Sequence, residues 1–528
     1  MMFGMIGDTE KKHFAHRYPQ GIAIVLAALC CLILITTLDD YGATWDEPLF
    51  LKAGRSYLQW ILNPSFDTID ASWEIMAEHP PLHKILGGLT RYIFYEKLSW
   101  TDELSSYRLS TVLFAFLLLS CLHRFAAQLY GTMIASLVTL GFFFMPHVFF
   151  HAHLGALDYS VTALIFAASY AYWKSLTHPR WIFICAVFLG LGFLTKLNIF
   201  FVYIPIFALF IMHHWSMIKV WLVKRTWDAF IPMLRMVKRQ WPIIAIPPVM
   251  FVALWPWMWT HTFPKIFSVF SYHWHHFRVP VLYFKEIYYQ APWHYPFVLV
   301  LIATPLLALL ALSIGLIFFR KLPDLKAHVF LVFSMLVPLV LIALPGVPKY
   351  DGIRLFLPAF PFLFILSGAG LWIVCQWLRG GWSKNIILMA YGALYALTVV
   401  TAIYRLHPSE MIYYNEFVGG VSGAFRHGFE TEFWGSSYLG VVDWLNDHAD
   451  RTYHVPIANH LLEEYYKQSG ALKLTISFGP LQSSDYMVLL MRQGMMGSVH
   501  WKYFTTKKPV FSLTASGIPL INIYKVDH

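Results

Sequence analysis

The sequence predicts a polytopic α-helical membrane protein that carries a small α/β domain at its C-terminal end. The 528-residue chain is 58% hydrophobic and only 13% charged, whereas soluble domains carry roughly 25% charged residues. Eleven apolar runs approach the length that crosses the hydrocarbon core of a bilayer, about 20 residues. Residues 405–528 break this pattern with short β-like segments, so we expect them to fold outside the membrane.

The distribution of Lys and Arg around the apolar runs predicts the orientation. The runs lie at about 20–38, 107–128, 131–150, 155–174, 180–196, 198–214, 242–260, 296–319, 327–345, 355–378 and 385–404. Lys and Arg gather before the first run, in the segment 215–241 and in two short later loops. Because cytoplasmic loops are enriched in these residues, the N-terminus is predicted to be cytoplasmic. The first run is longer than the apolar core of a signal peptide, so we expect an uncleaved helix.

Three segments then face the outer side. We expect a membrane module at 1–404 with outer loops at 39–106 and 261–295, and an outer α/β domain at 405–528. In this domain "TYHVPIAN", "LKLTISF", "DYMVLLM" and "PVFSLTASGIPLINIYKV" are typical of strands, and "SSYLGVVDWLNDHA" is typical of a helix.

Two other classes of function are disfavoured by composition. The net charge of +10 is spread between the apolar runs and forms no single basic stripe, so we expect no nucleic-acid partner. All five cysteines lie in apolar runs without a CxxC pair, which favours buried small hydrophobes over disulfides or zinc thiolates.

The stretch "TWDEP" places two acids, Asp46 and Glu47, just after the first membrane helix. One of them could cap the helix that begins near Pro48, since Pro suits the first helical position and acids suit the positive end. Capping accounts for one acid and not for two beside Trp45. We therefore treat both as candidate catalytic residues.

The stretch "EHPPLHK" lies later in the same loop and brings His79, His83 and Lys84 around two prolines that stiffen the backbone. A Lys at the membrane surface suits a phosphate. The alternative is a turn with an interfacial Lys whose charged end reaches water.

The stretch "HAHLGALDYS" offers His151, His153 and Asp158. Histidine with a carboxylate can hold a divalent metal such as zinc or manganese, although a His-x-His pair in a loop is equally typical of a membrane interface. Asp158 begins an apolar helix, where an acid needs a partner.

Two further segments supply cations. Arg278 and Lys285 lie in the aromatic loop 261–295, which is either an interfacial aromatic belt or a surface for a sugar and its phosphate. Arg354 begins a late helix and is suited to bidentate phosphate contacts. Acids and cations on the outer side fit a lipid-phosphate sugar donor, with a carboxylate base that deprotonates an acceptor hydroxyl.

The ordered motifs resemble the GT-C glycosyltransferases that use polyprenyl-phosphate sugars, especially protein O-mannosyltransferases and lipid A aminoarabinose transferases. The resemblance runs through "WDE", "HPPLHK", "YRLSTVL", "GALDYSVTA", "GLGFLTK", "GIRLFLPAFPFL" and the segment 407–435. His83 departs from it, because mannosyltransferases carry Gly there. The C-terminal α/β segment, in place of a MIR-type domain, points to a bacterial inner-membrane enzyme.

The resemblance implies a role for each residue. Asp46 would be the general base of an inverting transfer, and Glu47 would place the acceptor or the sugar. The residues implied for the donor phosphate and sugar are His79, His83, Lys84, Arg278, Lys285 and Arg354. Asp158 would hold the architecture of the site. The donor would be a polyprenyl-phosphate sugar, and the acceptor a hydroxyl or a phosphate of a lipid, a glycan or a protein on the outer side. A lipid-linked sugar transporter or flippase, or a non-catalytic assembly protein, remains the alternative.

Overall fold

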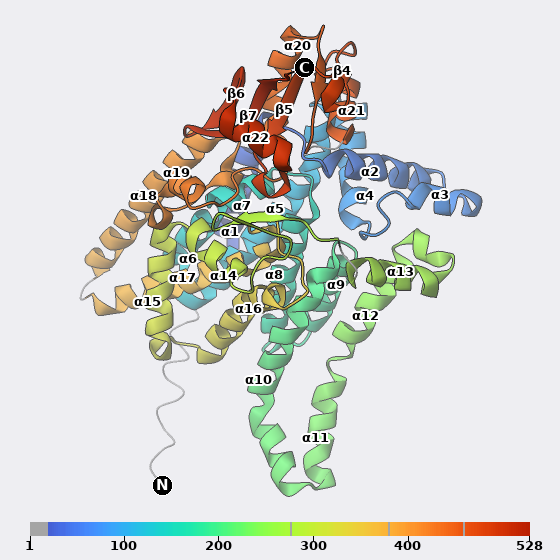
Figure 1. Cartoon of the computed structure of the whole chain (residues 1–528). Helices are drawn as coiled ribbons and strands as arrows, with labels where there is room; N and C mark the ends of the chain where they lie inside the picture. The colour runs from blue at the N-terminus through green and yellow to red at the C-terminus, as the bar shows by residue number, and fades with distance from the viewer. Residues whose placement is uncertain (1–19, 275–276, 379–380, 458–459, 528) are drawn as a thin grey trace.

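The computed structural model describes residues 20–274, 277–378, 381–457 and 460–527. Figure 1 shows a helical bundle with the C-terminal sheet at one end and α11 at the opposite end. The helices of the bundle are α1 (Gln20–Ile35), α5 (Glu103–Tyr130), α6 (Thr132–Phe143), α7 (Pro146–Ala152), α8 (Leu157–Ser175), α9 (Trp181–Phe193), α10 (Tyr203–Lys224), α11 (Trp227–Lys238), α12 (Trp241–Ala253), α14 (Tyr295–Ala303), α15 (Leu306–Ile317), α16 (Leu325–Ala343), α17 (Phe360–Trp377) and α18 (Gly381–Leu406).

Local signals in the sequence explain the ends of the longest helix, α5. The carboxylate of Asp102 accepts hydrogen bonds from the backbone N–H groups of Leu104 and Ser105, at 2.9 and 3.0 Å, and so caps the first turn. Gly131 ends the helix with a φ of 86°, which a residue without a side chain adopts at little cost.

The eleven apolar runs all fall on helices, but fewer than eleven helices have the length and composition of a membrane span. Among the described residues six qualify, namely Gly21–Asp40, Glu103–Tyr130, Leu197–Lys224, Leu325–Ala343, Arg354–Trp377 and Ser383–Leu406. Counting each of two bent pairs, α6 with α7 and α14 with α15, as one span gives eight. Helices α9 and α12 have 13 residues each, about 20 Å of helix, which is shorter than the hydrocarbon core of about 30 Å.

The two predicted outer loops contain short helices that border the bundle. The loop 39–106 forms α2 (Glu47–Leu62), α3 (Ile69–Trp73), α4 (Leu82–Arg91) and a π-helical turn, Tyr92–Lys97. The loop 261–295 forms α13 (Thr262–Trp274) and a hairpin of β1 (Val281–Tyr283) and β2 (Glu286–Tyr288). Lys265 of α13 forms an ion pair with Asp70 of α3, which joins the two loops.

The predicted C-terminal α/β region is confirmed. Its sheet has the order β4-β3-β5-β7-β6, with β3 parallel to its two neighbours and the other pairs antiparallel. The elements are β3 (Thr452–His454), β4 (Ser477–Phe478), β5 (Tyr486–Leu490), β6 (Phe511–Ala515), β7 (Ile518–Lys525), α19 (Gly420–Arg426), α20 (Val442–Asp447), α21 (His460–Gln468) and α22 (Ser498–Thr506). Strand β5 is almost entirely buried, which explains its unbroken apolar run.

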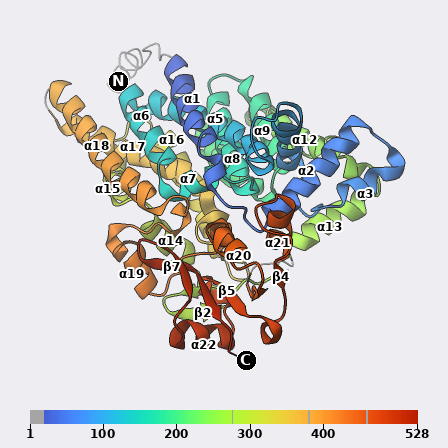
Figure 2. The ribbon, with the colours of Figure 1, turned by 90° about the horizontal axis from the view of Figure 1, so that it is seen from above.

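The C-terminal region packs directly on the bundle and the first outer loop, and Figure 2 shows the sheet beside the helices. A buried apolar cluster joins Tyr41 and Phe150 of the membrane part to Ile412 and Trp434. The backbone N–H of Trp45 donates to the carbonyl oxygen of Trp434 at 3.2 Å. Residues far apart in sequence therefore meet at the end of the bundle that carries the loop 39–106. The boundary between residues 404 and 405 stays a prediction.

Candidate functional site

A cavity of about 340 Å³ lies where the first outer loop, the start of α8, the turn before α17 and the C-terminal region meet. Its walls are formed by Trp45, Asp46, Phe50, Met76, Glu78, His79, Ala156, Leu157, Asp158, Lys196, Tyr272, Phe277, Val279, Tyr350, Asp351, Arg354, Trp434, Ile457, Arg492 and Met495. The mixture of acids, cations and aromatic rings resembles a ligand site more than a packing defect, which would be apolar.

Asp46 faces this cavity. It precedes α2, but its side chain makes no capping hydrogen bond, so helix capping does not explain it. The Asp46 carboxylate accepts a hydrogen bond from Trp434 Nε1 at 3.1 Å and lies 3.5 Å from Arg354 Nη2. With 28% of its side chain exposed, the carboxylate remains accessible to a ligand.

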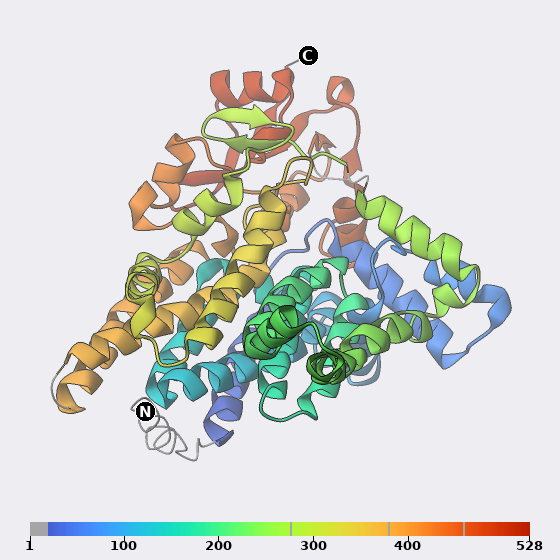
Figure 3. The same cartoon turned by 90° about the horizontal axis from the view of Figure 1, so that it is seen from below.

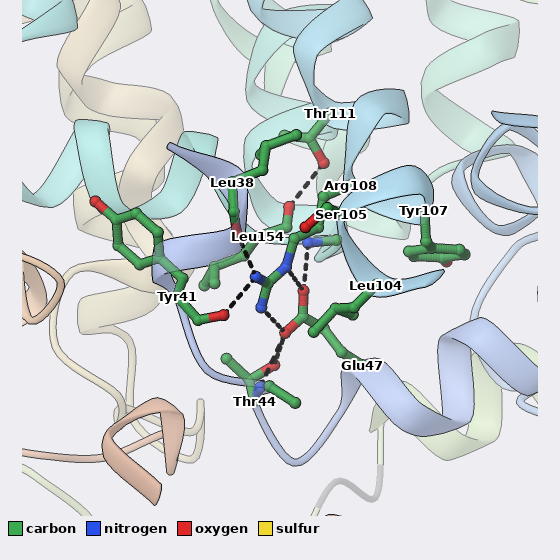
Figure 4. Close-up of polar contacts among 12 residues, drawn as sticks. Leu38, Tyr41, Thr44, Glu47, Leu104, Ser105, Tyr107, Arg108, Thr111 and Leu154 are labelled. Carbon is green, nitrogen blue, oxygen red and sulfur yellow. Dashed lines mark hydrogen bonds and ion pairs between the residues drawn. The ribbon is translucent and has the colours of Figure 1, made fainter. Parts of the chain in front are cut away.

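Glu47 lies in opposite surroundings, fully buried against α5. Figure 4 shows the guanidinium of Arg108 facing the Glu47 carboxylate, and two N–H···O contacts of 2.8 Å join them. The carboxylate also accepts from the backbone N–H groups of Thr44 and Gly155, at 2.9 and 2.7 Å. Burial alone would raise the pKa of Glu47, but Arg108 and these donors outweigh it and lower the pKa below its usual value.

The structure therefore corrects the predicted catalytic role of Glu47. Its oxygens are saturated by partners and do not line the cavity. We assign Glu47 a positioning role: it fixes the start of α2, and with it the neighbouring Asp46, against α5 and the loop before α8.

Asp158 is buried at the first turn of α8 and holds two cations in the cavity wall. Its carboxylate contacts Lys196 Nζ at 2.6 Å and Arg354 Nε at 3.0 Å. A buried acid is tolerated at a helix start when cations pair with it. The architectural role of Asp158 stays a prediction.

Arg354 is the centre of the charge network. Besides Asp158 and Asp46, its guanidinium contacts Asp351 Oδ2 at 2.8 Å and lies over the Trp434 ring, 4.4 Å from the ring centroid. The contact with Asp46 is the longest of the three carboxylate contacts. The Nη2 group that faces Asp46 is therefore the donor of Arg354 that a ligand would engage at the least cost.

Asp351 extends the network into the C-terminal region. Its φ of 57° places it in the left-handed region, and Gly352 follows with a φ of 61°. Such a conformation costs a non-glycine residue energy and is retained where the surroundings hold it. Here Arg492 Nη2 contacts Asp351 Oδ1 at 2.6 Å and Arg492 Nη1 donates to the Phe433 carbonyl at 2.6 Å. The Arg492 guanidinium also covers the Trp45 ring at 4.6 Å.

His79 is the one predicted residue of "HPPLHK" that lines the cavity. It contacts the rings of Phe50, Tyr272 and His273. Burial lowers the pKa of His79 well below its usual value, and nearby Lys196 lowers it further. His79 is therefore neutral at pH 7 and can donate or accept one hydrogen bond toward a ligand.

Lys84 and His83 lie outside the cavity wall, which corrects their predicted contact with a donor phosphate. Lys84 is buried and donates to the carbonyl oxygens of Met76 and His79, at 2.6 and 2.7 Å. Burial lowers the pKa of Lys84 to about 7. His83 pairs with Ser160 through Nδ1 at 2.9 Å. Lys84 thus fixes the loop that presents His79, and His83 joins α4 to α8.

Arg278 and Lys285 are both exposed and neither lines the cavity. Phe277 and Val279 contribute to the wall on either side of Arg278. Lys285 sits in the turn between β1 and β2 with a φ of 68°. The structure does not bring these two cations into the charge network, so their predicted phosphate contacts are revised.

His151 and His153 do not fit the metal site that the sequence suggested. His153 uses both ring nitrogens, Nε2 with Thr37 Oγ1 at 2.8 Å and Nδ1 with the Phe149 carbonyl at 2.7 Å. His151 packs edge-on against Trp434. Across the described ranges, no three His, Cys, Asp or Glu side chains are grouped as metal ligands.

Four important residues of the cavity were not predicted as site residues. Lys196 lies in the motif "GLGFLTK" and Asp351 directly precedes the motif "GIRLFLPAFPFL", so the motifs marked these segments although the two residues were not singled out. Trp434 lies in the segment 407–435 that carries part of the family resemblance. Arg492 follows strand β5 and has no local signal in the sequence.

Comparison with known proteins supports the same architecture. The model of a family described as dolichyl-phosphate-mannose-protein mannosyltransferase matches residues 78–232. This region contains His79, Asp158 and Lys196 but not Asp46. No curated protein sequence matches the chain.

Two solved structures of ArnT from Cupriavidus metallidurans are similar over nearly the whole chain. The apo structure has a TM-score of 0.51 and 14% identity and covers 95% of this chain and 98% of that chain. The structure with bound undecaprenyl phosphate has a TM-score of 0.49 and 15% identity and covers 96% and 98%. The chain has the GT-C fold. The resemblance predicted from the sequence motifs is thereby confirmed, and with it a multi-pass membrane architecture.

Proposed function

We propose that the chain is a membrane glycosyltransferase that moves a sugar from a polyprenyl-phosphate donor to an acceptor hydroxyl, with inversion at the anomeric carbon. The proposal rests on one observation: the accessible carboxylate of Asp46 lies in the same cavity as Lys196 and Arg354. A base and two phosphate-binding cations are what such a transfer needs. The active site would face the outer side of a bacterial inner membrane.

An apolar groove beside the cavity supports a lipid-linked donor. Leu197, directly after Lys196, lines a groove of about 380 Å³ together with Phe200, Tyr203, Phe251, Ile266 and Phe270. Helix α13 borders both spaces, since Phe270 lines the groove and Tyr272 lines the cavity. A polyprenyl tail in the groove would bury apolar surface while its phosphate lies near Lys196.

Arg354 connects phosphate binding with activation of the base. A donor phosphate that accepts from Arg354 Nη2 would replace the 3.5 Å contact with Asp46. Asp46 would then lose its cationic partner and become a better proton acceptor. The contacts of Arg354 with Asp158 and Asp351 would keep the guanidinium in place.

The transfer step then follows from the arrangement. Asp46 takes the proton of the acceptor hydroxyl, and the oxygen attacks the anomeric carbon. The bond from that carbon to the phosphate oxygen breaks, and its electron pair leaves on the phosphate. Lys196 and Arg354 stabilise the added negative charge. A single displacement inverts the configuration.

If Asp46 is a general base, the acceptor group is more readily a hydroxyl than a phosphate, because a hydroxyl has a proton to give up. A phosphate is already anionic at neutral pH and would gain little from Asp46. The acceptor hydroxyl would belong to a lipid, a glycan or a protein.

The test is turnover by the purified full chain with a panel of polyprenyl-phosphate sugars. We expect release of polyprenyl phosphate and a product whose anomeric configuration, read by NMR, is opposite to that of the donor. Retention would contradict a single displacement. Movement of intact donor across a vesicle membrane without cleavage would support the transporter alternative instead.

A further inference from the structure

A second pocket lies at the other end of the molecule from the proposed active site. It has a volume of about 540 Å³ and is formed by α10, α11, the start of α12 and the turn between α8 and α9. Figure 1 places α11 at the end of the molecule opposite the C-terminal sheet, and Figure 3 shows that end from below. The distribution of Lys and Arg predicts that this end lies at the cytoplasmic surface of the membrane.

The wall of this pocket is basic. It contains His213, His214, Arg235 and Arg239, and none of its lining residues is Asp or Glu. Arg235 lies on α11 and Arg239 directly follows its last residue, Lys238. The two arginines are four residues apart in helical backbone, so they share one face, where like charges repel. Within the described part of the chain, neither arginine forms an ion pair. An anionic ligand would relieve this repulsion.

The surface beside the pocket is apolar and faces outward. Phe183 of α9 is 46% exposed, and Trp241 and Ile244 of α12 are 54% and 66% exposed. Phe183 and Trp241 also line the pocket, and their rings are in edge contact with 5.8 Å between the centroids. Trp at the boundary between a polar pocket and an apolar surface is typical of the bilayer interface.

We propose that this pocket binds the phosphate headgroup of an anionic glycerophospholipid from the cytoplasmic leaflet. The two guanidinium groups would engage the phosphate, and Gln240 could hydrogen-bond the rest of the headgroup. The acyl chains would lie along Phe183 and Trp241. This site is separate from the donor cavity and does not depend on the proposed transferase activity.

The experiment compares lipid binding by the full-length protein in detergent. Phosphatidylglycerol and phosphatidylcholine with identical acyl chains are titrated, and bound lipid is counted by native mass spectrometry. We expect phosphatidylglycerol to bind at least about 10-fold more tightly. The variant R235Q/R239Q should lose this preference, whereas K224Q/R225Q, which removes the same charge outside the pocket, should keep it.

Other outcomes would overturn the proposal. Equal binding of both lipids by the wild-type protein would do so even if the variants failed to fold. An equal loss in both double variants would indicate general attraction to a basic surface. Inorganic phosphate that displaced the lipid at equal concentration would indicate a site for a free anion, and preferential binding of polyprenyl phosphate would indicate a donor-related site.

Discussion

Asp46 and Glu47 are adjacent residues with opposite surroundings, and this difference decides their roles. Glu47 turns toward α5, where Arg108 and two backbone N–H groups take up its charge. Asp46 turns the other way, where its firm contact is the indole N–H of Trp434. A carboxylate with spare acceptor capacity can take a proton, and a saturated one can only hold structure.

Replacing Glu47 by Gln should therefore act mainly on the stability of the folded protein and not directly on the transfer step. The change leaves Arg108 charged and buried without its partner, which costs on the order of 3–5 kcal/mol. We expect a markedly lower melting temperature for Glu47→Gln. Asp67→Asn, at an exposed position of the same loop, is the control and should melt like the wild type. A Glu47→Gln protein with normal stability and no turnover would instead restore a catalytic role.

Arg492 is predicted to be a positioning residue for the charge network. Arg492→Gln would leave Asp351 buried beside Arg354 alone, so the guanidinium of Arg354 should shift and kcat should fall, on the order of 100-fold for a misplacement of about 1 Å. Arg492→Lys should recover part of the rate. Arg451→Gln, at an exposed arginine of the same region, should leave kcat unchanged.

The pH profile separates this role from a loss of folding. Burial raises the pKa of Asp351, and Arg492 opposes the rise. Without Arg492 the carboxylate of Asp351 should protonate at a higher pH. The acidic limb of the pH profile of kcat should therefore move to higher pH. An unshifted acidic limb in a folded Arg492→Gln protein would contradict the assignment.

At the scale of elements, His407 joins the end of α18 to the loop after α1. Its Nδ1 contacts Glu410 Oε1 at 2.8 Å and its Nε2 contacts Asp40 Oδ2 at 3.0 Å. The hydrogen bond and charge of Glu410, aided by Asp40, raise the pKa of His407 to about 9 despite partial burial. The folded protein therefore keeps this histidine protonated at neutral pH.

This junction should make stability depend on pH. Because the folded pKa is raised above the usual value of 6.5, the stabilisation is complete below pH 6.5 and is lost as the pH rises through 9. We expect His407→Gln to lower the melting temperature most at pH 6 and little at pH 9.5. An equal decrease at both values would contradict the ionic contribution.

The helices and strands were largely predictable because their signals are local. Apolar runs, the cap at Asp102 and the unbroken apolar run of β5 each depend on neighbouring residues. The number of spans was not predictable in the same way. The runs at 180–196 and 242–260 have the composition of spans, but each forms a helix of only 13 residues. A 3₁₀ segment follows each helix, Leu197–Val202 after α9 and Pro256–Trp259 after α12.

At the scale of the whole molecule, the site is built from distant segments, and this limited its prediction. The sequence identified Asp46, His79, Asp158 and Arg354, which line one cavity. It could not distinguish a Lys that faces the cavity from one that donates to backbone carbonyls, as Lys84 does. That distinction depends on how α4 packs on α2 and α5.

The contribution of the C-terminal region was the least predictable part. Trp434 and Arg492 reach the cavity only because the sheet packs against the first outer loop. An alternating chain of charges, Lys196, Asp158, Arg354, Asp351 and Arg492, then connects the bundle to this region. Such a chain depends on tertiary contacts that no single motif encodes.

The most direct test of the central claim is the turnover of Asp46→Asn beside Asp67→Asn, measured with the best donor of the panel. We predict that Asp46→Asn keeps the wild-type melting temperature and donor affinity but loses at least about 100-fold in kcat, the scale expected for a missing general base. Asp67→Asn should retain full activity. Wild-type kcat in a folded Asp46→Asn protein would contradict the account and place the chemistry elsewhere in the cavity.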